Sequence, residues 1–198
     1  MAVMEVLGEA APGEDPGAFE CAACALRNMV VAGPEQFSEY MDLVVPRLLE
    51  IDPAAAGPAA RPVEEVLQTL FDSVDPENCV VCLLKLPPHG STAGPGLLTA
   101  IKMLNRAVVR LGEGEHLKVY VPPLFPGLLA AFASNSADVR KAVVFIIVDM
   151  YLLLGNWLQS FLEPLSTSQR RLLTIYINRA VKMKEGREGD LPPLSAAA

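Results

Sequence analysis

Prolines recur in this chain at nearly equal intervals of 42, 46 and 42 residues, at positions 34, 76, 122 and 164. Proline suits the first turn of a helix, because the N–H that it lacks would be unpaired there. Glycines follow the apolar runs at Gly33, Gly112 and Gly155, where helices typically end. No long segment alternates polar and apolar residues with a period of two, so the sequence predicts helices without a sheet.

The pattern predicts nine helices, at 16–32, 34–51, 62–74, 76–86, 95–111, 122–133, 137–154, 157–162 and 166–184. After the first, they form four pairs with the period of HEAT-type repeats, each of which has two antiparallel helices. Such repeats bury their apolar faces only against their neighbours, which predicts an all-α, right-handed α-solenoid. We expect one repeat domain over residues 15–184, with disordered ends at 1–14 and 185–198.

Composition excludes several classes of protein. Hydrophobic residues make up 52% of the 198-residue chain, which is too many for a disordered chain. The apolar run 142–154 is shorter than the roughly 20 residues of a membrane span, and the N-terminus does not read as a signal peptide, so we expect a cytoplasmic protein without membrane insertion. The net charge of −7 argues against nucleic-acid binding. Residues 102–198 are nevertheless basic and predict an acidic partner.

The segment 136–180, with the elements "SADVRK", "VDMY", "LSTSQ" and "TIYINRA", resembles the C-terminal end of CLASP proteins, above all the plant-type members. CLASPs are cytoplasmic-linker-associated regulators of microtubule plus ends. The resemblance covers roughly residues 35–184 and implies a TOG-like domain of the ARM type. It implies that this domain docks an adaptor or plus-end-tracking protein on the cytoskeleton, with tubulin bound indirectly. Direct tubulin binding is the alternative, although the single Trp157 lies in the last repeat rather than in the first inter-helix turn.

The "NSADVRK" stretch supplies two sets of candidate residues. In HEAT-like repeats, Asp138 and Arg140 would form a structural ladder, in which the arginine pairs with an aspartate of the neighbouring repeat. Asn135, Ser136 and Lys141 would lie on the ridge of inter-helix turns that TOG-like domains use for partners.

The predicted helix 95–111 carries a basic stripe. Lys102, Arg106 and Arg110 are spaced at i, i+4 and i+8, so they lie on one face. Such a stripe is either a solvated face or a docking strip for an acidic partner segment.

Three further features have mainly structural interpretations. Asp149, within the apolar run, is expected to reach solvent or to pair with Arg170 or Arg171. Trp157 is expected mainly in the core. The last helix is amphipathic, and its apolar stripe is expected to cap the stack.

Two C-x-x-C pairs, Cys21 with Cys24 and Cys79 with Cys82, raise the alternative of a zinc or redox protein. The 54 residues between them exceed the usual zinc spacing, so buried packing on helical faces is the preferred interpretation. Cys79 lies near a helix start, which can lower the pKa of a thiol. No other motif indicates catalysis, so we expect no enzyme, metal or cofactor.

Overall fold

The computed structural model describes residues 16–51, 60–86 and 96–189, and every regular element in these ranges is helical. The elements are α2 (Pro16–Ala32), α3 (Pro34–Ser38), α4 (Met41–Glu50), α6 (Ala60–Ser73), α7 (Pro76–Leu84), α9 (Leu97–Leu111), α10 (Glu115–Phe132), α11 (Ala137–Leu154), the 3₁₀ turn η2 (Gly155–Leu158), α12 (Gln159–Leu162) and α13 (Thr167–Gly189).

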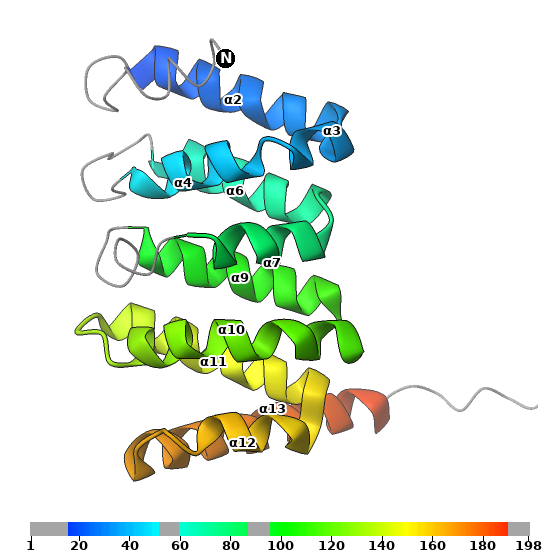
Figure 1. Cartoon of the computed structure of the whole chain (residues 1–198), viewed down its shortest axis with the longest axis vertical. Coiled ribbons are helices and arrows are strands. Elements are labelled where there is room, and N and C mark those ends of the chain that lie inside the picture. Colours follow the sequence, from blue (N-terminus) through cyan, green and yellow to red (C-terminus); the bar gives the residue numbers. More distant parts are fainter. Residues whose placement is uncertain (1–15, 52–59, 87–95, 190–198) are drawn as a thin grey trace, which may run out of the picture.

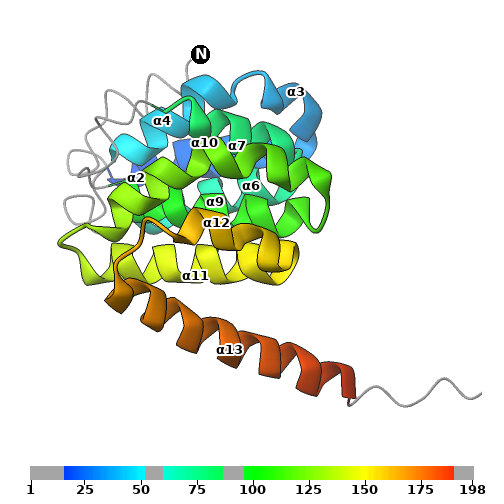
Figure 2. The same ribbon diagram turned by 60° about the horizontal axis from the view of Figure 1, so that its bottom comes forward.

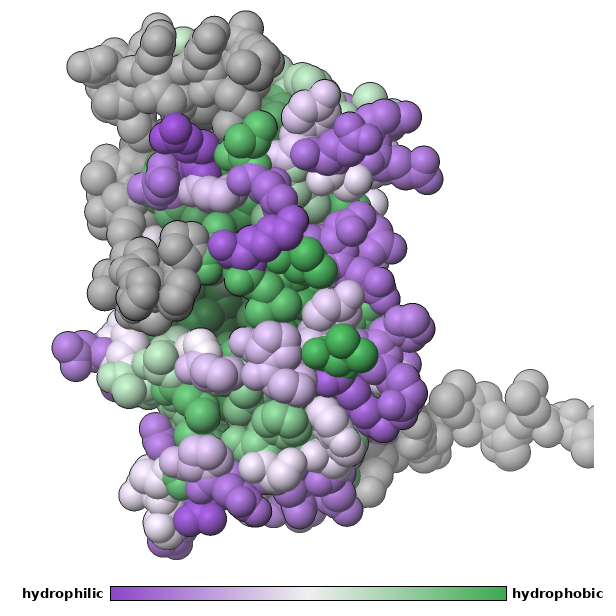
Figure 3. Space-filling model, viewed as in Figure 1, coloured by the Kyte–Doolittle hydropathy of each residue, from purple (hydrophilic) through white to green (hydrophobic). Residues whose placement is uncertain are grey.

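The helices stack in two layers along the long axis of the molecule (Figure 1). In one layer α2, α6, α9, α11 and α13 each contact the next, and in the other α4 contacts α7 and α7 contacts α10. A single hydrophobic core continues between the layers from Phe19 to Ile177. Figure 3 shows hydrophobic residues gathered along the middle of one face and hydrophilic residues along its edge. The predicted all-α solenoid is confirmed.

Helix ends follow the local signals in the sequence. Asp75 caps α7, because its Oδ1 accepts hydrogen bonds from the N–H groups of Glu77 at 2.9 Å and Asn78 at 3.3 Å. Ser166 and Gln169 form a reciprocal cap at the start of α13. Both α9 and α11 end at a glycine with positive φ, Gly112 and Gly155. Glycine adopts such a φ without strain, because it has no Cβ.

The predicted starts at Pro16, Pro34 and Pro76 are confirmed, and two other boundaries differ from the prediction. The predicted helix 34–51 is divided into α3 and α4, and the predicted start at Pro122 is wrong, because α10 begins at Glu115. Pro122, Pro123 and Pro126 lie inside α10 on its exposed side, where water can satisfy the carbonyls that proline leaves without a donor.

The two ends of the predicted domain fall partly outside the described residues. The last helix was predicted to end at 184, and the backbone of α13 continues to Gly189. Residues 1–14 and 190–198, which were expected to be disordered, are not among those described.

One helix could be mistaken for a membrane span. By length and composition alone, residues 137–162 would suffice to cross a bilayer, a test that a core helix of a water-soluble fold also passes. Here Val143, Ile146, Ile147 and Met150 of α11 are fully buried between neighbouring helices.

Candidate partner-binding groove

The basic stripe of α9 reaches α6, although its three residues remain exposed. Lys102 Nζ lies 3.6 Å from Glu64 Oε1, and Arg106 forms a two-pronged ion pair with Asp72, in which Nη2 lies 2.8 Å from Oδ2. The hydrogen bond from Arg106 to Asp72 raises the pKa of the guanidinium further above its usual value. These two cations therefore join consecutive helices of one layer.

Arg110 extends this contact to the end of α6. Its Nη1 donates hydrogen bonds to the backbone carbonyls of Phe71 and Val74, and the second of these is 2.7 Å long. These carbonyls lie at the C-terminus of α6, where unpaired oxygens carry partial negative charge. We call the contacts of Lys102, Arg106 and Arg110 with α6 the α6–α9 seam. All three residues of the predicted docking strip contribute to it.

The "NSADVRK" stretch forms the turn between α10 and α11. Arg140 Nη1 donates to the carbonyls of Ser134 at 2.6 Å and Asn135 at 2.9 Å. Ser136 Oγ caps α11 by accepting from the N–H of Val139 at 3.4 Å. Arg140 thus ties its own turn, in place of the predicted bridge to a neighbouring repeat, because the turn leaves two carbonyls free within its reach. Asp138 is exposed in the first turn of α11 and makes no ion pair with a described residue.

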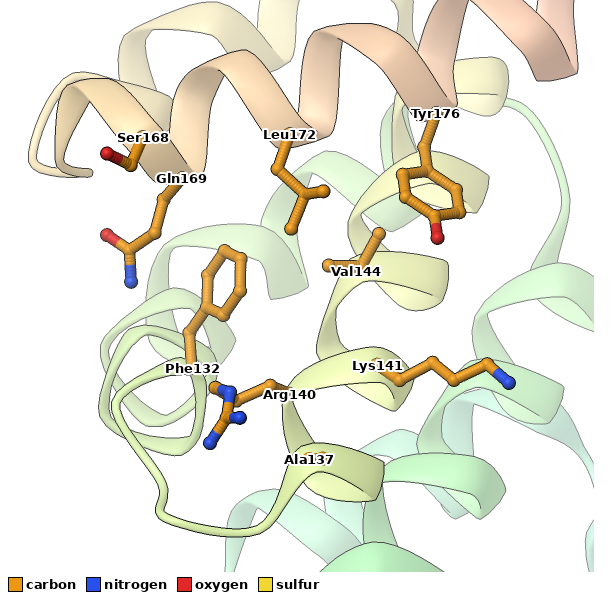
Figure 4. Close-up of a pocket in the computed structure, with 9 residues that line it drawn as sticks. All are labelled: Phe132, Ala137, Arg140, Lys141, Val144, Ser168, Gln169, Leu172 and Tyr176. Atoms are coloured by element: carbon orange, nitrogen blue, oxygen red, sulfur yellow. The ribbon is translucent and has the colours of Figure 1, made fainter.

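A groove lies between the start of α11 and the start of α13. Its volume is about 420 Å³. Nine side chains from three helices line it: Phe132, Ala137, Arg140, Lys141, Val144, Ser168, Gln169, Leu172 and Tyr176. Figure 4 shows Phe132, Val144 and Leu172 directed toward its interior, with Arg140 and Lys141 on the α11 side. Of the predicted partner-binding residues, only Lys141 lines the groove, while Asn135 and Ser136 lie in the adjoining turn.

Aromatic and cationic groups meet at one end of the groove. Lys141 Nζ lies 5.8 Å from the centre of the Phe145 ring, and that ring meets Tyr176 edge to face at a centroid distance of 6.2 Å. Leu172 is 41% exposed. No carboxylate is among the lining residues, so the described groove is apolar and positively charged.

The groove exists because α13 packs on the stack along a narrow line. Of its described side chains, only Leu173 and Ile177 are buried. Figure 2 shows α13 crossing beneath α11 and extending beyond the stack. The prediction that its apolar stripe caps the stack therefore holds for Leu173 and Ile177, and in part for Tyr176 and Ala180, which pack half-buried against the core. Leu172 and Met183 remain exposed.

Asp149 has a different partner from the one predicted. Asn105 Nδ2 of α9 donates to Asp149 Oδ2 at 2.8 Å, and neither Arg170 nor Arg171 pairs with it. Those arginines lie on exposed positions of α13, on the opposite side of α11 from α9. Asn105 Oδ1 is buried without a hydrogen-bond partner.

Trp157 is not a core residue. It is 38% exposed, packs on Phe161 at a centroid distance of 5.1 Å, and has Lys118 Nζ 5.7 Å from its ring centre. The 3₁₀ turn η2 directs Leu158 inward instead, where it is fully buried.

The two C-x-x-C pairs lie in different environments. Cys79 and Cys82 are buried, as predicted, but Cys21 and Cys24 are exposed, because Ala22 and Ala23 fill the core-facing positions of α2. Burial raises the pKa of the Cys79 and Cys82 thiols to about 12, so the lowering considered for Cys79 at the helix start is wrong. Among the described residues, no three His, Cys, Asp or Glu side chains are grouped to hold a metal ion.

Most of the residues that line the groove were not predicted from the sequence to bind a partner. Leu172 and Tyr176 belong to the apolar stripe of the last helix, which was expected to cap the stack. The useful signal is that Leu172 and Leu173 are adjacent, so that the apolar surface of α13 is wider than one neighbouring helix covers.

Fold and surface together define an all-α helical solenoid with a groove at one end. No model of a known protein family matches the chain. It is 31% identical over 184 residues to a CLIP-associated protein of Arabidopsis thaliana and 33% identical over 179 residues to CLIP-associating protein 1-B of Xenopus laevis. These matches cover 93% and 90% of this chain and 12% of each relative. The chain is thus homologous to a segment of the CLIP-associated, or CLASP, proteins, and the predicted resemblance is confirmed. The plant and frog proteins match it to a similar degree.

Proposed function

We propose that this chain is the non-catalytic docking domain of a CLASP-like, microtubule-associated protein. It binds an adaptor or plus-end-tracking protein and so places microtubule stabilisation at plus ends or at the cortex. The observation that carries this proposal is the match over about nine-tenths of the chain to proteins named for association with CLIP. Because the chain spans only 12% of those relatives, their other activities are not carried over.

The geometry supports a binding role. A stack with one continuous core presents a fixed surface, and the groove gives that surface a place where apolar side chains of a partner can be buried. We place this activity in the cytoplasm, on the cytoskeleton, in keeping with the CLASP relationship.

Direct binding of tubulin is the second candidate. The exposed Trp157, with Lys118 against its ring, is the kind of aromatic and basic pair that tubulin-binding TOG domains present. It lies between α11 and α12, however, far along the chain from the first inter-helix turn.

Size-exclusion chromatography separates the two candidates. The purified chain is mixed in one run with a fragment of a cytoplasmic linker protein (CLIP) and in another with tubulin dimer. We expect co-elution with the CLIP fragment and not with tubulin, and a Trp157→Ala variant that behaves like the parent chain. Co-elution with tubulin that is lost in Trp157→Ala would establish the second candidate instead.

A further inference from the structure

The groove combines an apolar floor with unneutralised positive charge. We propose that it docks a short acidic segment of the partner, with apolar side chains against Phe132, Val144 and Leu172 and carboxylates at Arg140 and Lys141. This inference rests on the docking function proposed above and specifies its site and the chemistry of the partner.

The shape of the groove favours a short segment over a flat protein surface. Its volume of about 420 Å³ lies within the roughly 300–1,000 Å³ of ordinary ligand pockets. Phe132 lies at the floor and is buried, while Leu172 and Lys141 are exposed at the sides. A partner therefore has to insert side chains to reach the floor, which a peptide segment does more readily than a flat face.

Arg140 is held ready to bind an anion. Its two hydrogen bonds to the turn carbonyls both come from Nη1. Its other two guanidinium nitrogens have no hydrogen bond to a described residue. Because the turn fixes the side chain, a partner carboxylate would bind it with little further loss of side-chain entropy.

Lys141 adds a second positive charge beside the apolar floor. Its ammonium lies over the Phe145 ring, and it makes no ion pair with a described residue. A carboxylate near Lys141 would gain an electrostatic attraction that nothing in the described chain already satisfies.

The α13 side of the groove carries the same sign of charge, whereas the α11 side includes one exposed carboxylate, Asp138, between the lining residues Ala137 and Arg140. Between Thr167 and Lys184, α13 contains five cations and no carboxylate: Arg170, Arg171, Arg179, Lys182 and Lys184. Of these only Lys184 makes an ion pair with a described residue, Glu113 at 3.4 Å. Charge complementarity therefore selects an acidic partner and repels a basic one.

Two matched pairs of variants test the site. Leu172→Ser and Ile175→Ser each remove an exposed apolar side chain of α13, but only Leu172 lines the groove. Lys141→Glu and Lys182→Glu each reverse one exposed charge, but only Lys141 lines it. Unfolding curves for all four variants establish that each is folded before binding is measured.

The probe is a display library of short peptides of unbiased charge, selected on the intact chain, followed by fluorescence anisotropy on the enriched peptides. We expect enriched peptides with Asp or Glu beside Leu, Ile or Phe. Kd should rise about tenfold or more in Leu172→Ser and Lys141→Glu, and less than about twofold in Ile175→Ser and Lys182→Glu.

Several results would overturn this inference. They are enrichment of basic peptides, no enrichment at all, or equal weakening in the control variants. A dimer of the chain that Leu172→Ser dissociates would make a second copy the occupant and would equally overturn it.

The docking function and the groove fail in different ways. Acidic peptides that bind the groove, together with a CLIP fragment that does not bind the chain, would refute the docking function alone. A bound CLIP fragment that Leu172→Ser and Lys141→Glu leave unaffected would refute the groove alone.

Discussion

Cations lie both at the α6–α9 seam and at the junction of α11 with α13, but only at the seam do they bind groups of the neighbouring helix. At the seam, three cations of α9 reach carboxylates or carbonyls of α6, so each already has a partner on the neighbouring helix. At the α11–α13 junction, Arg140 bonds its own turn and Lys141 contacts an aromatic ring. In the described part of α13, Leu173 and Ile177 are buried, and Tyr176, Ala180 and Val181 pack half-buried against the core. Spacing on a helix thus does not distinguish a stabilising cation from an available one, because the neighbouring helix decides which it becomes.

The largest effect should come from removing what holds α13. Leu173 is 1% exposed, so Leu173→Ala should lower the free energy of unfolding by about 3 kcal/mol, through lost burial and the cavity left behind. Leu172→Ala, one residue earlier, should cost less than about 1 kcal/mol, since Leu172 is already partly exposed. Urea unfolding followed by circular dichroism measures both, and equal losses would show that Leu172 also helps to hold α13.

The next largest effect is a difference in stability loss between substitutions of Arg110 and Arg140, the two arginines that donate hydrogen bonds to backbone carbonyls. Arg110→Met should cost about 1.5 kcal/mol, because it leaves the C-terminus of α6 without a donor from α9. Arg140→Met should cost about 0.5 kcal/mol, because hydrogen bonds of Ser134 and Ser136 also hold that turn.

The same urea titration compares the two arginine variants. A larger loss in Arg140→Met than in Arg110→Met would contradict the distinction between a bond across repeats and a bond within one turn. Methionine keeps much of the apolar stem of arginine, so the difference reports mainly on the hydrogen bonds.

The smallest effect is a change in thiol reactivity, which is measured on the folded protein and reports on the α6–α9 seam. At pH 8, Ellman's reagent should react rapidly with Cys21 and Cys24 and slowly with Cys79 and Cys82, which are buried with thiol pKa values raised to about 12. Cys79 Sγ lies 4.0 Å from the Val74 carbonyl that Arg110 also contacts. Burial raises the pKa of the Cys79 thiol and the Arg110 cation lowers it, so Arg110→Met should slow the reaction of Cys79 further, while Lys141→Glu should not.

The raised pKa values also set a pH dependence. The thiols are neutral in both folded and unfolded chains below their ordinary pKa of 9.0, so their contribution to stability is complete there. It is lost as pH rises from about 9 toward 12, because only the unfolded chain then gains thiolates. Cys79→Val with Cys82→Ala is the control, and four fast thiols in the folded parent chain would refute the burial of this pair.

Local chemistry was predictable, and contacts between helices were not. The caps at Asp75 and at Ser166 with Gln169 depend on neighbours within three residues, so the sequence contains all the information they need. The face of α9 that carries Arg106 also followed from spacing alone. Its partner Asp72 lies 34 residues away, at a register fixed by packing of the core.

The candidate site depends on geometry that no pattern encodes. Lys141 was identified, but the groove that it lines depends on the angle at which α13 packs against α11. Trp157 was placed wrongly because the chain continues from α11 through a 3₁₀ turn, which rotates the side chains relative to an α-helix.

The prolines of α10 govern how the outer surface of that helix can be used. Pro122, Pro123 and Pro126 cannot donate, so the carbonyls of Lys118, Val119 and Pro122 lack the usual helical donor and depend on hydration. Excluding water from that side would cost about 1–3 kcal/mol for each carbonyl left unpaired. A partner that needs a dry interface is therefore directed away from the outer side of α10.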